Sequence, residues 1–186
     1  MTIIFVTVIA YLIGSLPVSF LWGWARFRHR PMISSVNPPN DPLVVLGIQV
    51  GKGVTATTAG LLFAGWAGAA MAAIAAVVGE VFSVFRRFQG GDGAVVAAGA
   101  LLVLSPILIL LGVVIYGLSL LLTRYFSLST MVTAVLLMVL SLVLFPQVYV
   151  ILVVFAAGGL VLYRHWGDFG RWKRGLEIPF RFKWFR

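Results

Sequence analysis

The stretch that decides the fold is the uncharged run from Phe126 to Tyr163, FSLSTMVTAVLLMVLSLVLFPQVYVILVVFAAGGLVLY. As one helix, its 38 residues would measure roughly 55 Å, whereas the hydrocarbon core of a bilayer is about 30 Å thick. Pro146-Gln147 interrupts the run near its middle, and proline is not tolerated inside a regular helix. The run therefore predicts a helical hairpin in a membrane, turning at Pro146.

Two earlier runs repeat this pattern, and a shorter run precedes them. Val54 to Phe85 has 32 residues with a breaker at 65–68, and Gly93 to Thr123 has 31 residues with a breaker at 105–106. Glycine and proline at these points predict two further hairpins. Thr2 to Trp24 has the length of one span. The sequence thus predicts an all-α integral membrane protein with seven short transmembrane helices, one anchor plus three helical hairpins.

Composition supports this class and excludes others. Of the 186 residues, 61% are hydrophobic and only 10% are charged, against about a quarter in soluble domains. The absence of cysteine excludes thiolate metal sites, and two histidines with five acids are too few to indicate a metal centre. In a membrane chain, a net charge of +9 indicates contact with anionic lipid headgroups rather than with nucleic acid.

The basic residues predict the orientation in the membrane. With seven spans, segments 25–53, 86–92, 124–125 and 164–186 share one side and contain all fourteen Lys and Arg residues. Because such residues accumulate on the cytoplasmic side, we expect the N-terminus outside and the C-terminus in the cytoplasm. Residues 1–186 would then form a single polytopic domain, and 164–186 a basic aromatic tail along the inner membrane surface.

Two features within the spans bear on packing and chemistry. Residues 56–79, ATTAGLLFAGWAGAAMAAIAAVVG, are rich in small side chains, for which we favour tight packing within the chain over a dimer seam. Glu80 lies near the inner end of a span, where a carboxylate is a candidate functional group. A salt bridge from Glu80 to Arg86 or Arg87 is an equally good explanation.

Five fragments, taken in order, resemble a known family. They are AYLIGSLP (10–17), VGEVFSVFRRFQGGDG (78–93), LSP (104–106), TRYFSLS (123–129) and LYRHWGDFGRWKRGLE (162–177). Together they resemble the bacterial acyl-phosphate-dependent glycerol-3-phosphate acyltransferases of the PlsY type, over nearly the whole chain. The resemblance implies seven spans in the bacterial cytoplasmic membrane. It also implies acyl transfer from acyl phosphate to glycerol 3-phosphate without a metal or cofactor.

The family's signature loops imply a phosphate site on the cytoplasmic side. The positions of this chain that match it, or that are its remnants, are Ser34, Asn37, Lys52, Arg86, Arg87, Gly90, Gly91, Gly93, Arg124, Ser127 and Ser129. The chain departs from the family at charged positions, because Glu80 replaces a histidine and Asp92 replaces a lysine. The first loop, ISSVNPPNDP at 33–42, has three prolines and no glycine where the family has a glycine-rich nest.

These departures led to two hypotheses of function. Two carboxylates would oppose an anionic substrate, since like charges about 4 Å apart cost about 4 kcal/mol at an effective dielectric constant of about 20. We therefore favour a catalytically silent scaffold or accessory subunit, which contacts lipids and other membrane protein subunits. The alternative is an active acyltransferase, for glycerol 3-phosphate or another acceptor, with Glu80 as the general base. An ion pathway has little support, because a pathway needs several ionisable groups within the spans.

Overall fold

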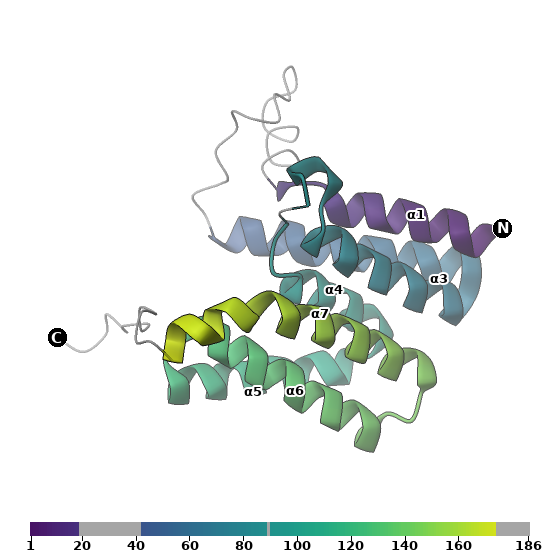
Figure 1. The fold of residues 1–186 in the computed structure, drawn as a ribbon. Helices are drawn as coiled ribbons and strands as arrows, with labels where there is room; N and C mark the ends of the chain where they lie inside the picture. The colour runs from purple at the N-terminus through teal and green to yellow at the C-terminus, as the bar shows by residue number, and fades with distance from the viewer. Residues whose placement is uncertain (19–41, 89, 174–186) are drawn as a thin grey trace.

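The computed structural model describes residues 1–18, 42–88 and 90–173, with the backbone alone for 168–173. Every regular element in the described part of the chain is helical (Figure 1). The elements are α1 (Thr2–Ser15), α3 (Pro42–Val81), the short 3-10 helix η1 (Val84–Arg86), α4 (Ala94–Leu104), α5 (Pro106–Thr123), α6 (Phe126–Leu144) and α7 (Val148–Lys173). The predicted all-α class is confirmed.

Helix α3 reverses its direction at Ala64 and Gly65. Gly65 has φ of 64° and ψ of −160°, a conformation that favours glycine because a Cβ atom would clash there. Beyond the turn the chain runs back along itself, so that Gly60 packs directly against Gly68. The turn expected at 65–68 is therefore confirmed, and so is the tight packing of small residues within the chain.

The other two breakers also end helices. Ser105 lies between α4 and α5, with Pro106 in the first turn of α5, where a missing N–H is harmless. Pro146-Gln147 lies between the end of α6 at Leu144 and the start of α7 at Val148. Gly158 of α7 packs against Met138 of α6, so these two helices lie side by side. Both breaks are where the sequence predicts them.

Several of these helices suit a membrane. In the described ranges, four helical stretches are long and apolar enough to cross one: Pro42–Arg86, Pro106–Thr123, Phe126–Leu144 and Val148–Gly167. The first of them contains the reversal at Gly65. Their outer surfaces are apolar, and Leu122 and Val143 are 85% and 75% exposed. Such surfaces are stable against lipid tails and would aggregate in water.

Two expected boundaries need correction. α1 ends at Ser15 rather than at Trp24, because Leu16 precedes Pro17 and is extended, with ψ of 125°. α3 begins at Pro42, so that 42–53 are helical and not part of an inner loop. Lys52, which was expected in the inner segment 25–53, is buried inside the helix.

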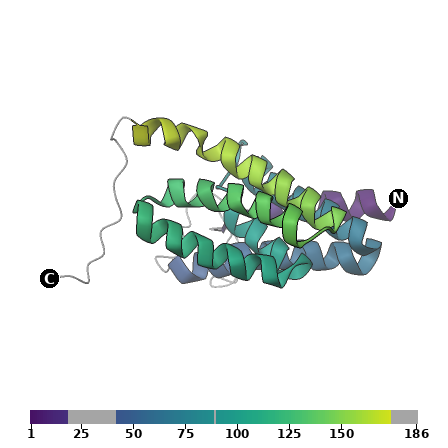
Figure 2. The same cartoon turned by 90° about the horizontal axis from the view of Figure 1, so that it is seen from below.

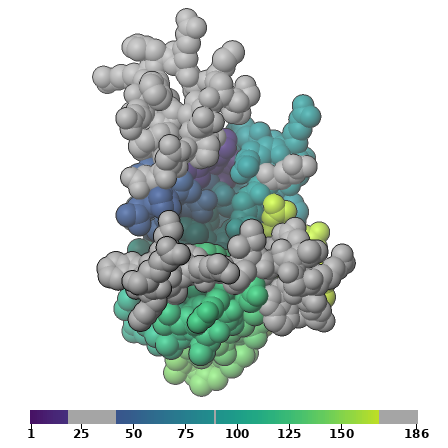
Figure 3. Space-filling view, turned by 90° about the vertical axis from the view of Figure 1, so that its left-hand side faces the viewer, coloured from purple at the N-terminus to yellow at the C-terminus, as the bar shows by residue number. Residues whose placement is uncertain are grey.

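One end of the bundle gathers most of the polar segments. Figures 1 and 2 show that the ends of α1 and α7, the start of α3 and the junction of α5 with α6 lie at this end. Residues 82–88 and 90–93 lie there as well, and the N-terminus lies at the opposite end. We call this the polar end. In Figure 3, which views it directly, α1 is recessed between the start of α3 and the segment around 82–93.

Candidate functional site

The centre of the polar end is a buried ion pair between Lys52 and Glu80. Their side chains are only 4% and 8% exposed, and they come from opposite halves of α3. Lys52 Nζ also donates hydrogen bonds to Gly14 O at 3.0 Å and Leu16 O at 2.9 Å. These carbonyls at the end of α1 lack partners within that helix, and a cation suits them. One lysine therefore joins α1 to both halves of α3.

The residues Gly90 to Gly93 form a glycine-rich segment. Glu80 also positions this segment through its backbone. Gly91 N–H donates to Glu80 O at 2.9 Å, and Gly90 N–H donates to Val81 O at 3.2 Å. A Cβ atom on Gly91 would lie 2.6 Å from Glu80 Oε1, so a larger residue there would have to displace the carboxylate that binds Lys52. The amides of Gly90 and Gly91, candidates for holding a phosphate, are thus bonded within the protein. Gly93 caps the start of α4 with φ of 73°.

Two hydroxyl groups tie α1 to the turn after α3. Ser83 Oγ donates to Ser15 O at 2.5 Å, and Tyr11 OH donates to Phe82 O at 2.8 Å. Each bond joins residues about seventy positions apart. Ser83 is 2% exposed, so its bond forms away from water, where an unpaired partner is costly.

Helix α7 contributes a contact from Arg164 to the glycine-rich segment. Arg164 Nη2 donates a hydrogen bond to Gly90 O at 3.1 Å. Next to it, the rings of Phe82 and Tyr163 pack with centroids 6.4 Å apart. His165 is 5% exposed, and its ring bonds to Val161 O within the helix. Arg164 therefore joins α7 to the glycine-rich segment.

Arg86 and Arg87 do not bind Glu80, which corrects one of the two readings of that carboxylate. Both arginines are exposed, and no residue in the described part of the chain forms an ion pair with either. Asp92 is exposed as well. Lys52, 28 positions before Glu80, is the partner that the sequence did not indicate.

The junction of α5 and α6 forms a separate hydrogen-bonded corner. Ser129 is fully buried, and its Oγ donates to Tyr125 O at 2.8 Å and lies 2.9 Å from Thr123 Oγ1. Arg124 is exposed with φ of 61°, and Ser127 lies in the first turn of α6. The two remaining candidates, Ser34 and Asn37, lie outside the described residues.

The sequence missed Tyr11, Ser15, Ser83 and the contact of Arg164. All four stand in fragments that resemble the family, which was a signal for them, but nothing in those fragments indicated their partners. The residues described hold no group of three or more His, Asp or Glu side chains that could ligate a metal ion.

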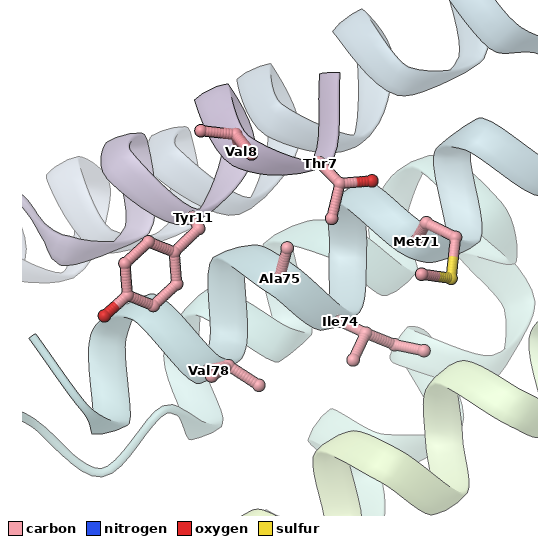
Figure 4. Close-up of a pocket in the computed structure, with 7 residues that line it drawn as sticks. All are labelled: Thr7, Val8, Tyr11, Met71, Ile74, Ala75 and Val78. Carbon is pink, nitrogen blue, oxygen red and sulfur yellow. The ribbon is translucent and has the colours of Figure 1, made fainter. Parts of the chain in front are cut away.

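An apolar groove lies beside this site, between α1 and the second half of α3 (Figure 4). Its volume is about 310 Å³, and it is lined by Thr7, Val8, Tyr11, Met71, Ile74, Ala75 and Val78. Apart from two hydroxyl groups, these side chains are apolar. Because Tyr11 OH bonds to Phe82 O, the groove begins next to the turn after α3. A groove of this kind suits a hydrocarbon chain.

The fold and its polar end define a class: a helical membrane protein with arginines around a buried, charge-neutral centre and a glycine-rich turn. The model of the family described as "Glycerol-3-phosphate acyltransferase" matches residues 42–175. The chain belongs to this family.

Similar proteins agree with the family. The glycerol-3-phosphate acyltransferase 2 of Bacillus cereus is 31% identical over 175 residues, or 88% of each chain. The glycerol-3-phosphate acyltransferase of Symbiobacterium thermophilum is 33% identical over 184 residues, or 92% of each chain. The fold resembles the crystal structure of PlsY (YgiH), an integral membrane glycerol 3-phosphate acyltransferase, in its lysophosphatidic acid form. That likeness has a TM-score of 0.83 and 22% identity, and it covers 97% of this chain and 96% of the other.

These relatives correct the preferred hypothesis of a silent scaffold or accessory subunit. Proteins about one third identical over most of their length are named as acyltransferases, and none of the comparisons indicates a scaffold. The physical reason for the error is the charge of Glu80, which was counted as free. Lys52 neutralises it inside the protein. The chain is a bacterial membrane protein of an enzyme family.

Proposed function

We propose that this protein transfers a fatty acyl group from acyl phosphate to glycerol 3-phosphate. The acceptor hydroxyl oxygen forms an ester bond with the acyl carbonyl carbon, and the bond from that carbon to the phosphate oxygen breaks. Inorganic phosphate leaves and takes up the hydroxyl proton. An acyl phosphate is an activated anhydride, so positioning and electrostatic stabilisation supply most of the required catalysis.

The observation that carries this proposal is the pairing of Glu80 with Lys52. A free carboxylate would repel the phosphate groups of both substrates, but the buried pair has no net charge. Arg124, at the junction of α5 and α6, is exposed at the same end of the bundle, and Arg164 borders the glycine-rich segment. The polar end therefore keeps the positive charge that two anionic substrates require.

We assign Glu80 to the support of the site rather than to proton transfer. Its Oε2 atom is bound to Lys52, and its Oε1 atom lies against Gly91. Both oxygens of the carboxylate thus contact the protein, so we give it a structural role in this proposal. In this proposal, Arg124, Arg164 and the N–H groups at the start of α4 contact the substrate phosphates.

The groove between α1 and α3 is proposed to hold the acyl chain of the donor. It lies within the apolar part of the bundle, and its Tyr11 end adjoins the turn after α3. A donor lying there would place its hydrocarbon chain in the groove and its phosphate at the polar end. Ala75 lines the groove, and its small side chain leaves room for a chain.

The finer topology is part of the proposal. We infer seven spans, an outside N-terminus and a cytoplasmic C-terminus for a multi-pass protein of the bacterial inner membrane. The reversal at Gly65 and the breaks near Ser105 and Pro146 support the number, and the clustering of basic residues supports the orientation. A single domain over 1–186, with an interfacial tail at 164–186, follows from this arrangement.

A substrate comparison tests the function. Purified protein in mild detergent is incubated with acyl phosphate and with either glycerol 3-phosphate or glycerol, and products are measured by mass spectrometry. We expect lysophosphatidic acid from the first acceptor and at least a hundredfold slower reaction with glycerol, since two charge-assisted contacts are worth about 3 kcal/mol or more. A faster reaction with glycerol would show that the site prefers a neutral acceptor.

A further inference from the structure

The turn from Val84 to Phe88, with the sequence VFRRF, has all five residues exposed. Val84, Phe85 and Phe88 are 50%, 44% and 64% exposed, although they are apolar. They lie in or just after η1, beyond the end of α3. Apolar side chains that gather on a surface in this way mark a site of interaction.

The backbone of this turn is fixed. Arg87 and Phe88 have φ of 52° and 63°, which is unfavourable for residues with a side chain. Phe88 N–H donates to Ser83 O at 2.8 Å, and Arg87 N–H donates to Val84 O at 3.4 Å. Because two successive residues are held in this conformation, the outward position of Phe88 is a built feature of the turn.

Helix α7 places further aromatic side chains at the same end of the bundle. Tyr163 and Trp166 are 69% and 71% exposed, and the ring of Tyr163 packs on Phe82 next to the turn. They also lie at the end of the apolar stretch Val148–Gly167. Aromatic and arginine side chains at the end of a span are typical of the boundary between lipid tails and headgroups.

We propose that the Val84–Phe88 turn docks into the headgroup layer of the membrane, with Phe85 and Phe88 among the upper acyl chains and both arginines on anionic phospholipid phosphates. Charge complementarity supports this partner, since no described residue pairs with Arg86 or Arg87. This lipid contact goes beyond the proposed function, because it concerns bulk membrane lipid rather than a substrate. This lipid contact anchors the glycine-rich segment, which follows the Val84–Phe88 turn in the sequence.

The chain has no cysteine, so a single nitroxide label reports the depth of one position. The full-length protein carries Val84→Cys and is reconstituted in nanodiscs of phosphatidylcholine alone or of an equal mixture with phosphatidylglycerol. Collision with oxygen and with a water-soluble nickel chelate gives the depth. Asp92→Cys, exposed in the same segment, is the aqueous reference, and Leu122→Cys, 85% exposed on α5, is the lipid reference.

We expect the label at 84 to lie deeper than the label at 92, and deeper still when the anionic lipid is present. In the double variant Arg86→Gln, Arg87→Gln, the label at 84 should no longer move deeper when anionic lipid is present. Each arginine removed should lower the preference of the turn for anionic over neutral lipid about fivefold. Phe85→Ser with Phe88→Ser should move the label towards water. A monodisperse elution profile confirms the fold of each variant.

Three results would overturn the proposal. One is a label at 84 as accessible to the chelate as the label at 92, which needs no variant and therefore no assumption about folding. Another is a depth that does not respond to lipid charge. The third is a depth in phosphatidylcholine discs that shifts on addition of soluble glycerol 3-phosphate, which would assign both arginines to the substrate instead.

Discussion

Lys52 and Glu80 form a buried ion pair between the two halves of α3, and Lys52 also binds the last carbonyls of α1. The charge of Glu80, which would oppose an anionic substrate if it were free, is therefore balanced within the bundle. The pair also places the backbone carbonyl of Glu80 where it accepts from Gly91. Packing at the polar end and the electrostatics of the site depend on the same two residues.

Breaking this pair should destabilise the protein more than removing both charges. Lys52→Met leaves a buried carboxylate unpaired, and we expect a loss of about 3–5 kcal/mol. Lys52→Met combined with Glu80→Gln should lose less than the sum of the single changes, because no isolated charge remains. Denaturant unfolding in detergent, followed by tryptophan fluorescence, measures all four states of the cycle. Additive losses would show that the two side chains do not interact.

The glycine at position 90 should be essential for the shape of the site. A Cβ atom there would lie against Glu80 O and 2.6 Å from Val81 O, so Gly90→Ala must shift the turn. We expect at least a tenfold fall in kcat/KM for glycerol 3-phosphate. Gly117→Ala is the matched control, since nothing lies within 4 Å of its Cβ position in α5. Equal kcat/KM values for the two variants would show that the shape of the site does not depend on Gly90.

Arg164 should hold the turn through a directed hydrogen bond rather than through charge alone. Arg164→Gln removes the donor to Gly90 O and a positive charge, and we expect a loss of about tenfold in kcat/KM. Arg164→Lys keeps the charge but not the planar geometry, so it should recover only part of that loss. Full recovery by lysine would mean that the charge of residue 164 is sufficient.

Two substitutions of Ser83 separate the contribution of its hydrogen bond to stability from the contribution of backbone rigidity. Ser83→Ala loses the bond to Ser15 O, at about 1–2 kcal/mol of stability. Ser83→Pro loses the same bond, but φ of Ser83 is already −66°, which is the value that proline imposes. Proline should therefore be the more stable variant by about 0.4–1 kcal/mol, through restriction of the unfolded chain. Thermal unfolding of the two variants decides the order, and a less stable proline variant would show strain in the turn.

Filling the groove should affect long donors more than short ones. Ala75→Leu adds a side chain between α1 and α3, and the proposed site of the acyl chain becomes shorter. We expect the ratio of kcat/KM for a long-chain acyl phosphate to that for a short-chain one to fall at least tenfold. Ile107→Leu, on an exposed surface of α5, is the control. A uniform loss for both donors would place the acyl chain elsewhere.

The architecture was largely readable from the sequence, because its signals are local. Gly65, Pro106 and Pro146 constrain the backbone at their own positions, so the turn and breaks near them could be predicted. The start of α3 was not predicted, because the uncharged run begins only after Lys52. Its burial at position 52 becomes possible only with a carboxylate and two carbonyls around it.

The site was less predictable, since its contacts join distant segments. Nothing near Glu80 in the sequence indicates Lys52, whereas Arg86 and Arg87 are close by and were the obvious partners. The hypothesis of a lost activity came from counting charges without knowing which of them are paired. The hydroxyl bonds from Tyr11 and Ser83 span about seventy positions, and no pattern in a single sequence reveals such contacts.

The most direct measurement is the phosphate released by the purified wild-type protein when glycerol 3-phosphate is added to acyl phosphate. With the charge of Glu80 neutralised by Lys52, we predict repeated turnover and one phosphate for each lysophosphatidic acid formed. A folded, monodisperse protein that releases no phosphate above the rate without acceptor would contradict the proposed acyltransferase.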